Sequence, residues 1–164
     1  MNTPVYPHHR VGSQHTYLFF SVGTNGEISK VVRFSQMATP EFNIGDTIHY
    51  NVAFGDLKET NGDVEVDDSV RSNNGDMRKV LATVARIMEV FMKKHPGAVL
   101  FVSGYVDLEH REGHNNQRST LYQKIIDANW DALSPRFQFW GVIDRQLEIY
   151  MPRKSYEHVL IKRR

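Results

Sequence analysis

The stretch that decides the fold is SVRSNNGDMRKVLATVARIMEVFMKKHP, Ser69 to Pro96. Small polar residues lead into a segment whose apolar residues recur every three or four positions, which is the spacing of one helix face. Asp76 stands where an N-cap carboxylate accepts free backbone N–H groups, and Pro96 and Gly97 end the pattern. The stretch predicts a long helix with one apolar face, formed by Met77, Val80, Leu81, Val84, Ile87, Met88 and Phe91.

Strand patterns lie on both sides of this helix. An Asn-Gly turn at Asn25-Gly26 predicts a hairpin, and five apolar residues after Gly97 predict a central strand. The predicted strands are Tyr17–Val22, Ile28–Phe34, Ile48–Phe54, Ala98–Val102 and a pair around Asp144-Arg145, with a second helix over Ser119–Leu133 and a short last element over Tyr156–Ile161. The order β-β-β-α-β-α-β-β indicates an α+β fold, an antiparallel-rich mixed sheet with two main helices packed on it.

Length and composition limit the class of protein. The 164 residues predict a flexible N-terminal arm over residues 1–15 and a single α+β domain over 16–164. The absence of cysteine excludes disulfides and thiolate zinc sites and is compatible with a reducing cytoplasm, the predicted location. No apolar run reaches the roughly 20 residues that span a bilayer. The net charge of +1 gives no argument for a nucleic-acid binder. No cofactor is predicted.

The corner before the long helix is the first candidate site. Asn73, Asn74 and Gly75 precede a helix N-terminus, where free N–H groups and the dipole suit an anion. Local turn chemistry explains the same residues, because asparagine caps its own backbone and glycine permits the tight bend. Asp76 also repels an anion at that helix end. Both interpretations stay open.

The second candidate is the start of the second predicted helix. Arg118 is electrostatically unfavourable at a helix N-terminus, which makes sense if it contacts a phosphate or an acidic side chain. Tyr122 lies four residues later on the same helix face. The alternative is an internal salt bridge from Arg118 and a core position for Tyr122.

Two further patterns contain side chains that can bind a metal ion. His110 and His114 are four residues apart, but Gly113 and the surrounding polarity indicate a loop, so the helical spacing loses its meaning. An acidic set could bind magnesium, although a solvated charged hairpin face is more common; it comprises Asp56, Asp63, Glu65, Asp67 and Asp68. We predict no metal site.

Several motifs together resemble a family of small uncharacterised bacterial proteins. They are YLFFSVG with KVVRF, NVAFGD, SNNGDMRKVLATV and RSTLY, within Tyr17 to Ile161. The family's pattern reads SNNGDxxKVLATV at the helix start and RxxLY at the second helix. The resemblance implies no activity and directs attention to Asn73, Asn74, Gly75, Asp76, Lys79, Arg118, Leu121 and Tyr122. The loop before Arg118 is longer and more charged than the family's pattern.

Two functions fit these observations. The first is a protein-binding or regulatory module, in a bacterial defence or toxin–antitoxin-like system, that binds through a sheet edge, its arm or the aromatics near Trp140. The second is a toxin-like enzyme acting on RNA or a nucleotide. There, Asn73, Asn74, Lys79 and Arg118 would bind the substrate, and Asp76, Arg118 and Tyr122 are the catalytic candidates. The oligomeric state stays open, a homodimer included.

Overall fold

The structure is a computed structural model of the chain, and it describes residues 3–12, 15–60, 63–67, 74–103 and 117–164. Nine strands and three helices lie within these ranges. The helices are α1 (Met77–Lys94), α3 (Gln117–Ala128) and α4 (Trp130–Leu133); the strands are β1 (His8–Val11), β2 (Thr16–Gly23), β3 (Gly26–Gln36), β4 (His49–Thr60), β5 (Asp63–Asp67), β6 (Val99–Ser103), β7 (Phe137–Ile143), β8 (Gln146–Ile149) and β9 (His158–Arg163).

The strands form a mixed, mostly antiparallel sheet. Their hydrogen-bonded order is β1-β2-β3-β4-β6-β9-β7-β8, and β5 pairs with β4 outside this path. The chain divides into two compact units. We call Asn2–Ser35 with Val52–Lys94 the N-terminal unit, and Gln36–Asn51 with His95–Arg164 the C-terminal unit. The long strand β4 contributes residues to both.

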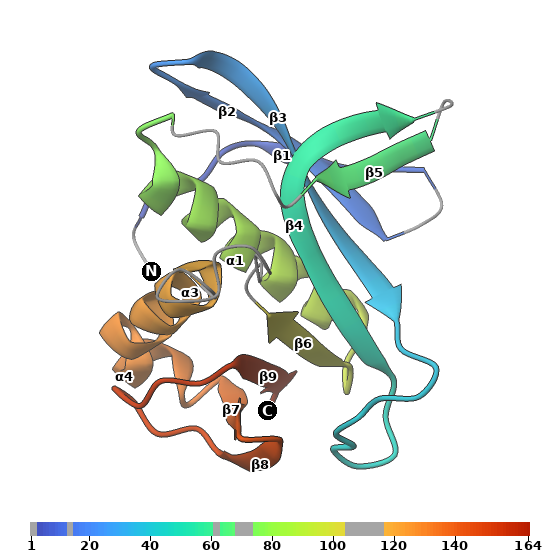
Figure 1. Cartoon of the computed structure of the whole chain (residues 1–164), viewed down its shortest axis with the longest axis vertical. Coiled ribbons are helices and arrows are strands. Elements are labelled where there is room, and N and C mark those ends of the chain that lie inside the picture. Colours follow the sequence, from blue (N-terminus) through green and yellow to red (C-terminus); the bar gives the residue numbers. More distant parts are fainter. Residues whose placement is uncertain (1–2, 13–14, 61–62, 68–73, 104–116) are drawn as a thin grey trace. The chain divides into compact units, whose positions relative to one another are not determined.

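In the N-terminal unit, α1 lies beside the strands (Figure 1), and its apolar face is buried. The rings of Phe34 on β3 and Phe91 on α1 are stacked with centroids 4.0 Å apart, and both side chains are buried. An aromatic pair such as Phe34 and Phe91 adds stabilisation beyond the area that it buries. In the same unit, the hairpin of β2 and β3 is in register from Thr16–Arg33 to Gly23–Gly26.

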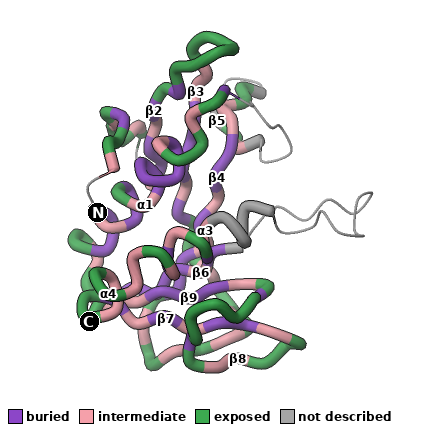
Figure 2. The backbone as a smooth tube through the Cα atoms, turned by 90° about the vertical axis from the view of Figure 1, so that its left-hand side faces the viewer, coloured by how far each residue is buried: buried purple, intermediate pink, exposed green. Residues whose placement is uncertain are grey.

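In the C-terminal unit, β9 lies between β6 and β7, and β8 ends the strand order. Val99, Val142 and Leu160 form a core cluster on one face, and both β7 and β9 carry several buried residues (Figure 2). Phe42 and Ile44, from the segment between β3 and β4, pack on this cluster. We call this side of the sheet the loop-side face; it also carries Phe101, Trp140, Leu147 and His158.

The sequence-based prediction of the long helix is confirmed, since α1 runs from Met77 to Lys94. The α+β class with an antiparallel-rich mixed sheet is confirmed as well. The element order differs from the prediction: β1 and β5 are additional, the predicted second helix is divided into α3 and α4 at Asn129, and the last element is a strand, β9. β1 lies within residues 1–15, where we predicted an arm. The division into an arm and one domain stays a prediction.

Candidate functional site

The asparagine of the SNNGD motif is buried and fully engaged at the corner before α1. Asn74 is 5% exposed. Its side-chain amide donates to Ser21 Oγ and to the Gly26 carbonyl, both at 3.0 Å. Its Oδ1 accepts the Asn25 N–H at 2.6 Å. Both amide hydrogens are therefore used to attach the corner to the β2–β3 hairpin.

The backbone of Asn74 makes a second attachment to the same hairpin. Its carbonyl oxygen accepts the N–H and the hydroxyl of Thr24, each at 3.2 Å. Gly23 passes so close that a Cβ there would lie 2.0 Å from this oxygen. Gly75 then turns the chain with a φ of +79°, a conformation that glycine adopts without strain. The motif thus fastens the start of α1 to β2 and β3.

Asp76 occupies the N-cap position of α1, as the sequence predicted, because its carbonyl accepts the Val80 N–H at 3.0 Å. Its carboxylate also has partners outside the helix. Oδ2 accepts the Tyr6 hydroxyl at 2.5 Å and the Ser21 hydroxyl at 2.6 Å. Such charge-assisted hydrogen bonds are stronger than neutral ones. They join three segments that are far apart in the sequence.

Tyr6 completes this cluster, and sequence reasoning missed it. Its ring stacks on Phe19 with centroids 6.0 Å apart, and its hydroxyl accepts the Val22 N–H at 3.2 Å. Lys79 places its ammonium 4.2 Å from the centroid of the same ring, a cation–π contact. The only available signal was an aromatic residue between two prolines in a polar segment, which does not reveal a distant partner.

Of the predicted site residues, the structure brings together the binding candidates Asn74 and Lys79 and the catalytic candidate Asp76, all around Tyr6 and Ser21. Asn73 lies outside the described residues. Arg118 falls in the first turn of α3, but its side chain is not described. Tyr122 is half-buried on the same helix. These two belong to the C-terminal unit, so a pocket shared by Arg118 and Asn74 stays a prediction.

The residue after Tyr122 has a structural role in the C-terminal unit. Gln123 exchanges two hydrogen bonds of 2.9 Å with the backbone of Tyr156. The ring of Tyr156 lies 5.0 Å from that of Tyr150, whose hydroxyl donates to Asp127 at 2.8 Å. Burial, followed by the hydrogen bond to Asp127, raises the pKa of Tyr150 far above its ordinary value. This hydroxyl therefore stays protonated and does not serve as a base at neutral pH.

The outer strand of the C-terminal unit, β8, presents apolar side chains, and its outward backbone groups have no strand partner among the residues that the structure describes. Tyr150 donates its N–H to the Phe139 carbonyl. Because hydrogen-bonded pairs alternate along an antiparallel ladder, the backbone groups of Leu147 and Ile149 point away from β7. Ile149 is 77% exposed and stands opposite the half-buried Trp140. Among the described strands, β8 is therefore an edge of the sheet, and one of its sides is apolar.

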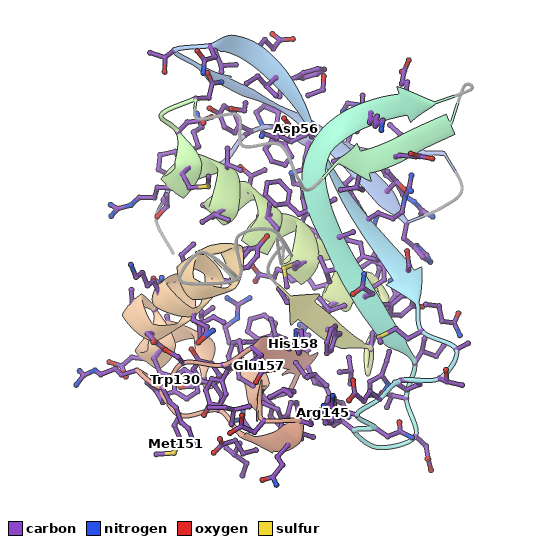
Figure 3. The ribbon with its side chains drawn as sticks, viewed as in Figure 1. Asp56, Trp130, Arg145, Met151, Glu157 and His158 are labelled. Atoms are coloured by element: carbon purple, nitrogen blue, oxygen red, sulfur yellow. The ribbon has the colours of Figure 1, made fainter. Side chains whose placement is uncertain are left out.

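The hairpin that holds β8 is tightly built. Asp144 and Arg145 form a two-residue turn with φ values of 51° and 60°, the left-handed pair that a type I′ hairpin turn requires. Asp144 also donates its N–H to Glu157 Oε1 at 3.0 Å. Figure 3 labels Arg145 at this turn and Glu157 next to His158 at the start of β9. This turn and the contact between Asp144 and Glu157 therefore hold β8 in a defined position at the edge of the sheet.

Two potential metal patterns can be placed only in part. Asp56 of the acidic set lies on β4 and forms a buried ion pair with Lys30. His110 and His114 lie outside the described residues. Within the part of the chain that the structure describes, no group of three or more histidine and acidic side chains is arranged to hold a metal ion.

His158 gives the protein a predictable pH dependence. Burial lowers its pKa, and the nearby Glu157 and Glu41 carboxylates only partly oppose this. The folded state therefore disfavours the charged imidazole, whereas the unfolded chain takes up the proton near pH 6.5. The free energy of unfolding should be at its full value above that pH and decline as the pH falls toward the lowered pKa of the folded state.

Urea unfolding of wild type and His158→Asn at a series of pH values measures this effect. In the asparagine variant, the free energy of unfolding should decline less steeply as the pH is lowered. His8 acts in the same direction, since burial lowers its pKa as well, so His8→Asn provides the parallel comparison. An identical slope in wild type and His158→Asn would contradict the prediction.

These features define an α+β protein with a mixed, mostly antiparallel sheet and a polar corner built from distant segments. A family model described as a family of unknown function (DUF6934) matches residues 2–164. The chain belongs to this family. No curated protein and no solved structure matches it. Among the described helices, none is long and apolar enough to cross a membrane.

Proposed function

We propose that this chain is a cytoplasmic protein-binding module that takes an extended segment of a partner protein as an added strand at β8. The observation that carries the proposal is the exposure of Ile149, 77%, on a strand whose outer backbone groups have no strand partner among the described residues. Strand addition uses such groups for affinity and the alternating side chains for specificity.

The charges of β8 also favour an added strand. Edge strands are commonly protected from pairing by charged side chains. The charged residue of β8 is Glu148, and it is neutralised by Lys154, whose ammonium lies 2.6 Å away. Leu147 and Ile149 remain on the loop-side face beside Trp140. The segment that fits would carry apolar side chains at alternate positions, because these side chains would lie next to Leu147 and Ile149.

A photo-crosslinking amino acid at position 149 tests the proposal in cells. We expect adducts with one partner protein, mapped to one extended segment of it. The same amino acid at position 20 is the matched control, since Phe20 is an exposed apolar strand residue of the N-terminal unit. Equal adducts from both positions would show that the contact is nonspecific and would contradict the proposal.

Purified partner then allows variants to be compared. Leu147→Pro removes an outward N–H, and proline is tolerated where an edge N–H faces solvent. We expect at least about tenfold weaker binding, which corresponds to about 1.4 kcal/mol. Phe20→Thr should bind like wild type. If folded Leu147→Pro, checked by circular dichroism, keeps full affinity, strand addition at β8 is wrong.

The alternative, a toxin-like enzyme acting on RNA or a nucleotide, is supported by the position of Arg118 in the first turn of α3. Growth of a bacterial host that expresses wild type or folded Arg118→Ala separates the two functions. Arrest by wild type alone favours the enzyme. Normal growth with both favours the binding module, whose partner would then be sought in defence or toxin–antitoxin-like systems.

A further inference from the structure

The segment between β3 and β4 covers part of the loop-side face of the C-terminal unit. Phe42 and Ile44 pack against the buried cluster of Val99, Val142 and Leu160. Among the residues packed on this cluster, these two are the ones that do not come from the strands of the sheet. The contacts that hold the segment in place therefore control how much apolar surface the unit exposes.

His49, the first residue of β4, holds this segment in place through hydrogen bonds. It is 2% exposed. Its Nε2 accepts the backbone N–H of Ile44 at 3.1 Å, and its Nδ1 lies 2.9 Å from the Thr47 carbonyl oxygen. An N–H can only donate and a carbonyl can only accept. The ring must therefore be the neutral tautomer with its proton on Nδ1.

A second proton on this ring is incompatible with the Ile44 hydrogen bond. Protonation would convert Nε2 into a donor that faces another donor, the Ile44 N–H. The Thr47 hydrogen bond would survive, because Nδ1 carries a proton in both states. Acid would thus break the contact that holds Ile44 while the strand end stays attached through the Val99 N–H, which donates to the Ile48 carbonyl at 3.0 Å.

Several elements around His49 carry titratable groups; β3, which adjoins Met37, whose N–H donates to the His49 carbonyl, carries Glu27, Lys30 and Arg33. The covering segment carries Glu41 and Asp46, and β6 carries none. On the loop-side face, β9 contributes His158 and Lys162, opposite Ser103 and Val99 of β6. His158 is a second imidazole near the segment, since Glu41 acts on it electrostatically. An experiment must therefore separate the two histidines.

We propose that His49 is a proton-sensitive latch: its protonation at Nε2 frees Ile44, lifts Phe42 and Ile44 from the sheet, and exposes the cluster of Val99, Val142 and Leu160. Imidazole is the side chain whose charge ordinarily changes in the physiological range. The latch stands on hydrogen bonds inside the chain and does not depend on strand addition at β8. It therefore holds or fails independently of the proposed function.

Nuclear magnetic resonance of the full chain tests the latch directly. The protein is labelled with ¹⁵N on isoleucine and histidine, and Ile44 is assigned with Ile44→Val. We expect a histidine with its proton on Nδ1 at about pH 8, and the loss of that pattern when the sample is acidified. Over the same range, the protection of the Ile44 amide against hydrogen exchange should fall about tenfold, as expected for the loss of one hydrogen bond.

Two substitutions give opposite expectations. His49→Gln places a carbonyl near the Nε2 position and cannot titrate, so the Ile44 amide should stay protected at every pH. His49→Asn keeps only a donor near Thr47, so the amide should be exposed at every pH. His158→Asn should leave the transition as in wild type.

The latch is overturned if the Ile44 protection of wild type does not change with pH. It is also overturned if His158→Asn abolishes the transition, because His158 would then be the responsible group. Should His49→Gln fail to fold, the tautomer in the wild-type spectrum decides. A proton on Nε2 instead of Nδ1 at about pH 8 contradicts the hydrogen bonds on which the latch depends.

Discussion

Replacing Asp56 by alanine is expected to lower the free energy of unfolding by about 3 to 5 kcal/mol. Asp56 on β4 pairs with the ammonium of Lys30 on β3, and the side chains are only 15% and 6% exposed. The variant leaves the lysine charge buried without this carboxylate, and burying such a charge is costly. Equilibrium urea unfolding monitored by circular dichroism measures the loss.

Two controls separate burial from charge. Glu148→Ala removes a partner of Lys154 from an ion pair that is far more exposed, 42% and 32%, so it should cost no more than about 1 kcal/mol. The double variant Lys30→Met with Asp56→Leu replaces the buried pair by apolar side chains of similar size. It should come within about 1 kcal/mol of wild type or exceed it. A wild-type unfolding midpoint for Asp56→Ala would contradict the prediction.

This ion pair also shows where sequence reasoning reaches its limit. The helix α1 and the β2–β3 hairpin could be predicted, because apolar spacing and an Asn-Gly turn are local signals. The acidic pattern around Asp56 predicts a solvated carboxylate, because nothing near it in the sequence indicates Lys30. Its partner is 26 positions away on another strand. Only the register of β3 against β4 brings the two charges together.

In the candidate site, too, some residues could be predicted from local sequence signals and others could not. The sequence singled out Asn74 and Asp76 through a motif at a helix start, and both lie in one hydrogen-bonded cluster. It could not predict Tyr6 or Ser21 as their partners, because these contacts join positions 55 and 70 residues apart. Sequence periodicity reports which face of an element is buried. It does not report which distant side chain completes a polar cluster.

Gly23→Ala is expected to be the most damaging small substitution at this corner. The new Cβ would lie 2.0 Å from the backbone oxygen of Asn74. That oxygen is held by two donors from Thr24, so relief of the clash breaks these hydrogen bonds. Overpacking costs about 1 to 3 kcal/mol and each lost hydrogen bond about 1 kcal/mol. With both hydrogen bonds lost, we expect a total of about 3 to 5 kcal/mol in urea unfolding.

Gly12→Asn is the matched control for this prediction, because it lies in the same unit but has open space around it. Its φ of +66° is left-handed, and asparagine tolerates that region better than other side chains. The control should therefore stay within about 1 kcal/mol of wild type. If Gly23→Ala is as stable as Gly12→Asn, the close approach of Asn74 does not exist in solution. The SNNGD motif would then not be held against the β2–β3 hairpin by this contact. That result would favour the anion-binding interpretation of Asn74.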